Sequence, residues 1–162
     1  MSLQVRLVTA ADYDDVARIT VAAYRADGQL AASPEYALVL GDVARRASAA
    51  DVLVAEDGGV VVGAVAFTLA GGEYAEVARD GEAEFRTLAV DPAAQGRGVG
   101  RALVQACVDR AAALGCRDLV IGVRNSNLGA LALYERFGFV RDEPLDWSPV
   151  PGVNLLGLRL KL

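Results

Sequence analysis

A run of alternating glycines, residues 95–101, separates a strand-like segment from a helix-like segment. The segment before it, residues 83–90, alternates in part between apolar and polar side chains and contains aromatic and β-branched residues, which predicts a strand that ends at Asp91-Pro92. The segment after it, residues 99–113, has apolar residues at helical spacing. The glycines are therefore expected at the N-terminus of a helix that directly follows a strand.

This position favours the binding of an anion. The first N–H groups of a helix have no partner within the helix, and the helix dipole places partial positive charge there. Gly96, Gly98 and Gly100 allow backbone N–H groups to approach oxygen atoms closely, and Arg97 and Arg101 add full positive charges. The segment is thus a candidate phosphate site, although a tight strand-to-helix turn without a ligand also explains three glycines.

Two well-known phosphate loops fit the segment poorly. A Walker-type loop requires Gly-Lys-Ser/Thr at the helix start, where this chain has Gly100-Arg101-Ala102. A dinucleotide fingerprint requires its third glycine at the position of Arg101, in a strand–helix unit that usually opens the domain.

The segment resembles the acyl-CoA-binding motif of the GCN5-related N-acetyltransferase (GNAT) superfamily, Gln/Arg-x-x-Gly-x-Gly/Ala after a strand that ends in a Val-Asp-Pro-like turn. A second signature of that family, Asn-x-x-Ala-x-x-x-Tyr-Glu-x-x-Gly-Phe, follows downstream. It is matched by Asn127, Ala130, Tyr134, Glu135, Gly138 and Phe139. The two motifs cover about the C-terminal half of the chain, and they occur in the family's order and spacing.

The resemblance implies an α/β (α+β) fold in a single domain, residues 1–162. The sheet is expected to be mixed and mostly antiparallel, with six to seven strands, a central parallel strand pair and about four flanking helices. The resemblance also implies acetyl-CoA as a co-substrate, with its pyrophosphate on the 96–101 turn and its pantetheine arm paired with the strand that ends at Val90. The residues expected to bind it are Leu88, Ala89, Val90, Gln95, Gly96, Arg97, Gly98, Val99, Gly100, Arg101, Asn127 and Ala130.

Acyl transfer to an amine requires an unprotonated nucleophile, stabilisation of the oxyanion and a proton for the departing thiolate. Glu84 lies at a strand position where many relatives carry a carboxylate, and it is the candidate base, acting directly or through water. A backbone N–H near Ala89 is the candidate oxyanion donor. Tyr134 matches the general acid of the family, and Asn127 is expected to cap a helix as well as contact the cofactor.

The charge and composition exclude several other kinds of chemistry. The chain has no histidine, which excludes Ser-His-Asp and Cys-His catalysis, and its net charge of −5 argues against a nucleic-acid partner. An acidic protein instead favours a cationic acceptor, so the expected partner is an amine-bearing compound. The two cysteines, Cys107 and Cys116, lack CxxC spacing and are expected to be reduced thiols, so no metal is predicted.

The N-terminus shows no signal peptide, and no apolar run is long enough to cross a bilayer, so a cytoplasmic protein with no membrane partner is expected. Dimers are common in the family, which leaves a homodimer open. The acyl group, acetyl or longer, and the identity of the acceptor are open as well.

Several further elements are expected from local patterns. A strand at 3–8 leads through a capping box at Thr9 and Asp12 into a helix, and Ser33-Pro34 starts a second helix that extends to about Ala47. Asp57-Gly58-Gly59 predicts a hairpin between strands at 52–56 and 60–67. Further predicted strands and loops are a loop at 71–81, a buried strand at 118–123, a strand at 139–141, a proline-rich loop that holds Asp146 and Trp147, and a last strand at 154–162.

The charged residues of the 71–81 loop, Glu73, Glu76 and Asp80, are interpreted as solvated charges, with attraction of an amine as the alternative. The leading functional hypothesis is an N-acetyltransferase that acts on a primary amine of a small molecule or peptide by direct attack. The first alternative is a non-catalytic domain that binds or senses acyl-CoA. The second is a nucleotide-binding module.

Overall fold

The computed structural model describes residues 2–162, and its strands follow the order β1-β2-β3-β4-β5-β8-β6, with β7 paired to β8. The strands are β1 (Leu3–Leu7), β2 (Asp51–Asp57), β3 (Val60–Leu69), β4 (Glu82–Val90), β5 (Asp118–Arg124), β6 (Val140–Arg141), β7 (Trp147–Val150) and β8 (Val153–Lys161). The α-helices are α1 (Tyr13–Ala26), α2 (Tyr36–Gly41), α3 (Val43–Ala49), α4 (Val99–Ala113) and α5 (Leu128–Arg136). Short 3-10 turns precede α1 (Ala10–Asp12), follow β4 (Pro92–Ala94) and precede β7 (Glu143–Leu145).

The mixed, mostly antiparallel sheet with one parallel pair confirms the predicted fold class, with one strand more than the six to seven expected among the described residues. The chain divides into two compact units. The first contains the residues up to Phe67 together with Thr87–Cys107, and the second contains Thr68–Arg86 and Val108–Leu162. Each unit is described in turn.

In the first unit, β1, β2 and β3 pair antiparallel. The predicted hairpin between β2 and β3 is confirmed, and its two glycines, Gly58 and Gly59, have φ values of 59° and 86°, as the favoured two-residue hairpin turn requires. The register shifts between Ala55 and Glu56, so that Val62 is an extra residue on β3. The carbonyl of Val62 then accepts a hydrogen bond from the N–H of Asp91 at 2.8 Å. A bulge in β3 therefore fixes the point at which β4 ends.

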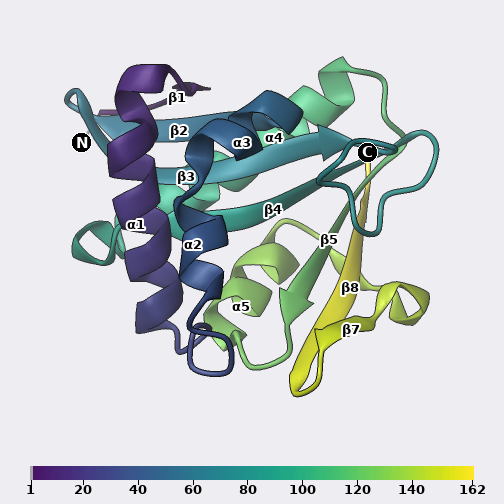
Figure 1. Ribbon diagram of the computed structural model, residues 1–162. Helices are drawn as coiled ribbons and strands as arrows, with labels where there is room; N and C mark the ends of the chain where they lie inside the picture. The colour runs from purple at the N-terminus through teal and green to yellow at the C-terminus, as the bar shows by residue number, and fades with distance from the viewer. Residues whose placement is uncertain (1) are drawn as a thin grey trace. The chain divides into compact units, whose positions relative to one another are not determined.

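Helices cover both faces of this sheet (Figure 1). The stripe of α1 that contains Val16 and Ile19, both fully buried, packs with Val43 of α3 onto β2 and β3. On the opposite face, α4 places Val99 and Leu103 against Gly63 of β3. The predicted helical periodicities of α1 and α4 thus correspond to faces that are buried.

The chain enters α1 through the predicted capping box. The Asp12 carboxylate accepts the backbone N–H of Thr9 at 2.8 Å and two hydrogen bonds from Arg6 of β1, at 2.8 and 3.0 Å. These hydrogen bonds, those of Arg6 first, hold the pKa of Asp12 well below its usual range. The carboxylate therefore ties β1 to the start of α1.

The single helix expected from Ser33 to about Ala47 is instead two helices, α2 and α3. The chain breaks at Asp42, which has a non-helical ψ of 72° and whose side chain accepts the N–H of Arg45 as the N-cap of α3. The buried side chain of Arg46 in α3 donates a hydrogen bond to the carbonyl of Leu40 at 3.0 Å. It thus provides a partner for a carbonyl group at the C-terminal end of α2. A local cap therefore overrides the continuous helical pattern.

In the second unit, the first residues of β4 pair parallel with β5, and β5 pairs antiparallel with β8 along its whole length. The predicted parallel pair is therefore confirmed. The expected loop around Trp147 is in part a strand, β7, which pairs with β8 through Trp147 and Val150. Among the described strands, β7 pairs with β8 alone and is therefore an edge strand. An edge strand tolerates Pro149, which has no backbone N–H to donate.

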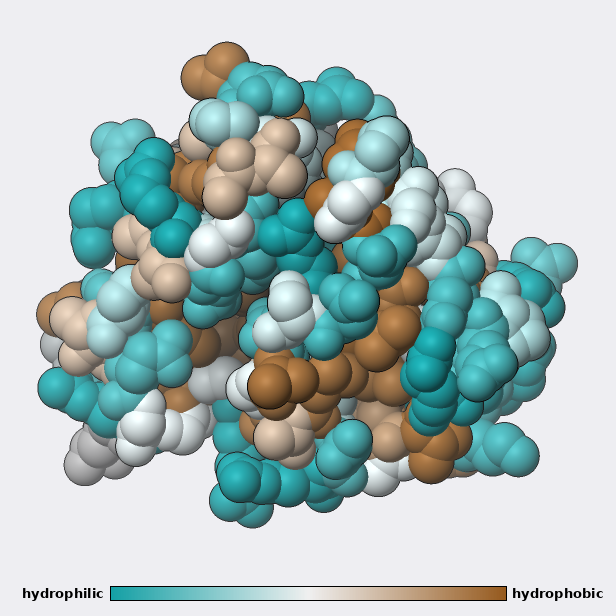
Figure 2. Space-filling model, turned by 90° about the horizontal axis from the view of Figure 1, so that it is seen from below, coloured by the Kyte–Doolittle hydropathy of each residue, from teal (hydrophilic) through white to brown (hydrophobic). Residues whose placement is uncertain are grey.

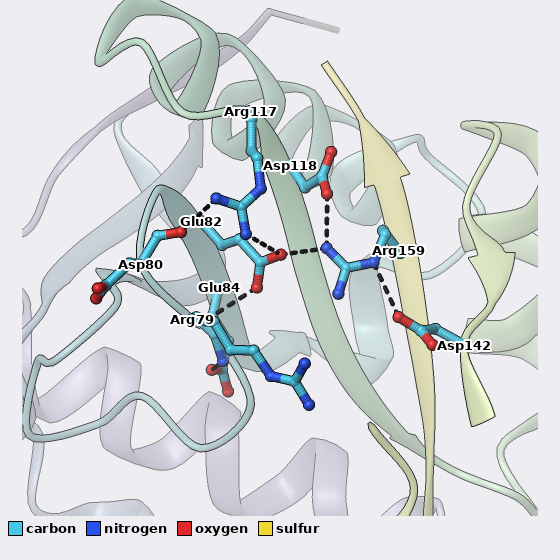
Figure 3. Close-up of polar contacts among 9 residues, drawn as sticks. Arg79, Asp80, Glu82, Glu84, Arg117, Asp118, Asp142 and Arg159 are labelled. Atoms are coloured by element: carbon cyan, nitrogen blue, oxygen red, sulfur yellow. Dashed lines mark hydrogen bonds and ion pairs between the residues drawn. The ribbon is translucent and has the colours of Figure 1, made fainter. Parts of the chain in front are cut away.

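A network of charged side chains around one buried carboxylate joins β4, β5 and β8 in this unit (Figure 3). The carboxylate of Glu82, which is 1% exposed, accepts hydrogen bonds from Arg117 and Arg159 and from the backbone N–H of Arg79. Arg159 also donates to Asp118 at 2.6 Å and to Asp142 at 2.9 Å. The negative charge of the buried Glu82 carboxylate is thus compensated by two guanidinium groups and one backbone N–H.

Some apolar side chains remain at the surface, and Figure 2 shows hydrophobic residues among hydrophilic ones on one face. Leu38 of α2 and Leu128 of α5 are the most exposed, at 81% and 73%. No helix within residues 2–162 is both long and apolar enough to span a bilayer.

Candidate functional site

The glycine turn lies where the sequence predicts it, between β4 and α4 in the first unit. Gly96 and Gly98 both have a φ of 80°, and a Cβ at either position would meet no atom within 4 Å. The turn therefore requires glycine for its backbone conformation and is open on its outer side. The 3.0 Å bond from the N–H of Ala102 to the carbonyl of Gly98 begins the helix, so α4 does not use the N–H groups of residues 96–101.

Asp91 holds the start of this turn. Its side chain accepts the N–H of Ala93 at 3.0 Å, its carbonyl accepts the N–H of Ala94 at 2.7 Å, and Arg18 of α1 lies 3.7 Å from its carboxylate. Gln95, Gly96, Arg97, Gly98 and Arg101 are exposed, whereas Val99 is buried and Gly100 half-buried. The turn thus presents backbone donors and two guanidinium side chains to solvent on a fixed base, which suits a diphosphate.

Just before the turn, β4 leaves regular strand geometry. Thr87 has a φ of 59°, in the left-handed region that a β-branched residue rarely adopts. Such an outlier is strained, and it changes the direction of the peptide groups that follow in Leu88, Ala89 and Val90. Ala89 is buried, and the other two are half-buried. These are the residues from which the resemblance predicts pairing with an extended ligand.

Glu84 lies in the second unit, on the first half of β4. Its side chain is 1% exposed, and its Oε1 accepts the backbone N–H groups of Glu76, Val77 and Ala78 at 2.9, 2.9 and 3.0 Å. Three donors that converge on one oxygen hold the 71–81 loop against the strand. All three bonds end on Oε1, so a single carboxylate oxygen anchors three consecutive residues of the loop.

Arg86, two residues further along β4, holds the same loop through its side chain. Its guanidinium donates to the carbonyl of Tyr74 at 3.1 Å, lies 5.7 Å from the centre of the Tyr74 ring, and approaches the Glu76 carboxylate to 3.4 Å. Burial raises the pKa of Glu76, the positive charge of Arg86 offsets part of this effect, and the negative charge of Glu84 adds to it. Glu76 is thus more than a solvated charge: the residue as a whole is exposed, but its side chain is 27% exposed and paired with Arg86.

Tyr134 of α5 is 6% exposed and packs in an aromatic cluster of the second unit. Its ring centre lies 5.6 Å from that of Phe85 in β4 and 5.9 Å from that of Phe139. Asn127 caps α5, as predicted, because its side chain accepts the N–H of Ala130 at 3.2 Å. The phenol is thus held by ring packing, and the start of α5 is fixed by its cap.

The predicted site residues fall into two groups. The first unit contains the turn at 95–101 together with Leu88, Ala89 and Val90, and the second unit contains Glu84, Asn127, Ala130 and Tyr134. Within the second unit, Tyr134 contacts Phe85, the residue that follows Glu84. The sequence reasoning missed Arg86 and the donors of residues 76–78. Its only available signal was that Glu84 and Arg86 occupy the same face of a strand, two residues apart.

The described residues contain no group of three or more side chains that could hold a metal ion. For phosphate binding, the turn supplies backbone N–H groups and the arginines Arg97 and Arg101. Neither cysteine forms a disulfide within the described residues; Cys107 is buried and Cys116 half-buried.

Comparison with known proteins agrees with this arrangement. Residues 13–139 match the Acetyltransferase (GNAT) family model. N-alpha-acetyltransferase RimI of Mycobacterium tuberculosis is 38% identical over 134 residues, which cover 78% of this chain and 82% of that protein. A mycothiol acetyltransferase of Amycolatopsis mediterranei is 45% identical over 60 residues, or 37% of this chain, but the match spans only 20% of its length.

Solved structures share the fold over nearly the whole chain. A putative acetyltransferase of the GNAT family from Desulfovibrio desulfuricans superimposes with a TM-score of 0.78 at 21% identity and covers 99% of both chains. A GNAT family acetyltransferase from Brucella melitensis, solved in complex with acetyl-CoA, has a TM-score of 0.67 at 28% identity, over 99% of this chain and 88% of that one. From its fold, its glycine turn and these matches, the chain belongs to the GNAT family of acetyltransferases.

Proposed function

We propose that this protein transfers the acetyl group of acetyl-CoA to a primary amine of a small molecule or peptide by direct attack. The observation that carries the proposal is the open turn with positive-φ Gly96 and Gly98 at the start of α4. The relative solved with acetyl-CoA supports the choice of cofactor. The relative named as an N-alpha-acetyltransferase supports an α-amino group as the acceptor.

In this proposal the diphosphate of acetyl-CoA lies on the N–H groups of residues 96–101, with Gln95, Arg97 and Arg101 around it. The pantetheine arm pairs with Leu88, Ala89 and Val90 in the manner of an added strand. Val99, Gly100, Asn127 and Ala130 complete the contacts at the two helix starts.

The chemical step follows from the groups that β4 and α5 supply. An alkylammonium has a pKa of about 10, so a base must remove one proton before the nitrogen lone pair attacks the thioester carbon. Glu84 takes this proton, directly or through water. The N–H near Ala89 stabilises the oxyanion, and Tyr134 donates its phenolic proton to the departing thiolate as the carbon–sulfur bond breaks. The attacking nitrogen, which became cationic when it bonded to carbon, loses its second proton to give the neutral amide, and this proton restores the phenol of Tyr134, directly or through water.

The test is acetyl transfer with a panel of acceptors that includes a short peptide with a free N-terminal alanine and several alkylamines. Release of CoA is measured by thiol detection, and the acetylated amine is identified by mass spectrometry. Acceptor-dependent release that matches the acetylated product supports the proposal. Calorimetric binding of acetyl-CoA without turnover on any acceptor would instead favour a non-catalytic acyl-CoA sensor, and binding of ATP in preference to CoA would favour a nucleotide-binding module.

A further inference from the structure

In the second unit, two side chains of β4 hold the preceding loop, residues 71–81. The proposed reaction does not by itself explain these contacts. Glu84 and Arg86 project from the same face of β4, since they are two residues apart on a strand. Glu84 accepts three backbone N–H groups from residues 76–78, and Arg86 holds Tyr74 and Glu76 through its guanidinium. Residues 74–78 are thus attached to β4 at both ends of the segment.

These contacts place the segment directly beside the proposed proton acceptor. The N–H of Glu76 lies 2.9 Å from Oε1 of Glu84, so residue 76 is one hydrogen bond away from the group that receives the proton. We infer that residues 74–78 form one wall of the acceptor site, that Arg86 is the positioning residue that holds this wall on β4, and that Glu76 selects acceptors that carry a positive charge. This inference rests on the proposed function.

The charges of the wall support a cationic ligand. Glu76 and Glu84 contribute two negative charges and Arg86 one positive charge, which leaves one negative charge without a partner among these three. Arg86 approaches Oε2 of Glu76 to 3.4 Å, and the Glu76 side chain remains 27% exposed, so an acceptor can approach it from solvent. A carboxylate whose side chain is only partly exposed binds an ammonium group more strongly than a fully solvated one, because water screens the interaction less. An acceptor ammonium has three N–H donors and can contact Glu76 while it gives a proton to Glu84.

Arg86 suits the positioning role because it makes three kinds of contact at once. Its guanidinium bonds the Tyr74 carbonyl, lies over the Tyr74 ring and pairs with Glu76, which fixes the backbone and the side chain of the wall together. A planar guanidinium presents several donors in a fixed fork and can also stack on a ring, so it makes this set of contacts with less loss of side-chain freedom than the point charge of a lysine. Arg86 therefore acts on the acceptor through Glu76 and not by touching it.

The experiment compares two isomeric acceptors, phenylethylamine, which is an ammonium ion at neutral pH, and ethylaniline, which is uncharged. Glu76→Gln is expected to raise KM for phenylethylamine about tenfold, equivalent to about 1.4 kcal/mol, with kcat within about twofold. KM for ethylaniline is expected to stay unchanged. The matched control is Asp80→Asn, which removes the same charge from the same loop; Figure 3 shows the carboxylate of Asp80 pointing away from the labelled cluster. This control should leave both acceptors unaffected.

The positioning role of Arg86 is tested by a double-mutant cycle. Arg86→Gln is expected to lower kcat/KM for phenylethylamine relative to kcat/KM for ethylaniline. When Glu76 is already replaced by Gln, adding Arg86→Gln should lower this ratio no further. A purely structural role of Arg86 would change both acceptors alike and add to the effect of Glu76→Gln.

Suppose that the wild-type protein acetylates both isomers and that Glu76→Gln changes KM equally for both. This result would overturn the inference and leave the proposed function intact. An absence of transfer from bound acetyl-CoA to either isomer and to every acceptor of the wider panel would overturn the proposed function instead.

Discussion

Arg159 of β8 donates a hydrogen bond to the carboxylate of Glu82 in β4, although the two residues are 77 positions apart in the chain and β5 lies between their strands. The guanidinium is 17% exposed and the carboxylate 1% exposed, so water screens this ion pair little. Because Arg159 also bonds Asp118 of β5, one side chain connects three strands of the second unit.

Arg159→Met is expected to destabilise the protein by about 3 kcal/mol, because it leaves the buried Glu82 with only its remaining donors. Urea unfolding measures the change. Arg117→Met removes the other guanidinium from the same carboxylate oxygen, but Arg117 is 60% exposed, so its loss should be clearly smaller. In the double variant Glu82→Gln/Arg159→Met the losses should be less than additive. Equal losses for the two arginine variants would show that burial does not determine the strength of these pairs.

The same pair predicts a dependence of stability on pH. Burial acts to raise the pKa of Glu82, but the hydrogen bonds from Arg159 and the backbone of Arg79 outweigh it and hold the pKa below its ordinary value of 4.5. A carboxylate with a lowered pKa in the folded state stabilises the fold above its ordinary pKa, and this stabilisation is lost as the pH falls through the lowered value. The free energy of unfolding should therefore decrease below about pH 4.5, and Glu82→Gln should flatten this part of the pH profile.

Gly63→Ala should destabilise the first unit by about 1–3 kcal/mol, because the added methyl group has no room. A Cβ at this position would lie 2.9 Å from the carbonyl oxygen of Ala89 and 2.8 Å from Cγ1 of Val99, so β4 or α4 would have to move. Urea unfolding again provides the measurement. Gly122→Ala, in β5, is the matched control, since its Cβ would meet its nearest atom, in Leu155, at an ordinary 3.7 Å. A similar loss in both variants would indicate a general cost of alanine in these strands.

Much of the fold follows from local patterns in the sequence. The Asp57-Gly58-Gly59 turn, the glycine turn at 95–101 and the Asn127 cap are fixed by residues that are neighbours in the chain, and each is found where it was predicted. The break between α2 and α3 was missed because Asp42 provides a cap in the middle of a continuous apolar pattern. The strand β7 was missed because its stability comes from pairing with β8, which local composition does not reveal.

The parts of the site that sequence did not reveal depend on contacts between distant positions or on backbone conformation. Glu84 was a candidate by its place on a strand, but nothing local indicated that three N–H groups of residues 76–78 would surround its carboxylate. The left-handed conformation of Thr87 has no signal in its own residue type, since a β-branched side chain disfavours it. It depends on the structure around the strand.

Gly98→Ala should weaken binding of acetyl-CoA about tenfold or more, because alanine disfavours the φ of 80° that orients the N–H groups of the turn. Isothermal titration calorimetry with acetyl-CoA measures the change. Gly28→Ala is a control for strain alone, since Gly28 has a φ of 76° with open space around it and lies at the end of α1. Both variants should lose a similar amount of stability, but only Gly98→Ala should lose affinity. Unchanged affinity in Gly98→Ala would contradict a phosphate site at this turn.

Tyr134→Phe separates chemistry from packing at the proposed general acid. The ring contacts with Phe85 and Phe139, at 5.6 and 5.9 Å between centres, can be kept by phenylalanine, and thermal unfolding measures any change in stability separately from activity. Loss of the proton donor should lower kcat about 100-fold or more with the affinity for acetyl-CoA unchanged. Tyr36→Phe, in α2, removes a hydroxyl group from a ring that packs on Tyr24 and should leave kcat unaffected. If Tyr134→Phe retains full turnover, the thiolate must receive its proton from water or from another residue, and Tyr134 would serve only as part of the aromatic cluster.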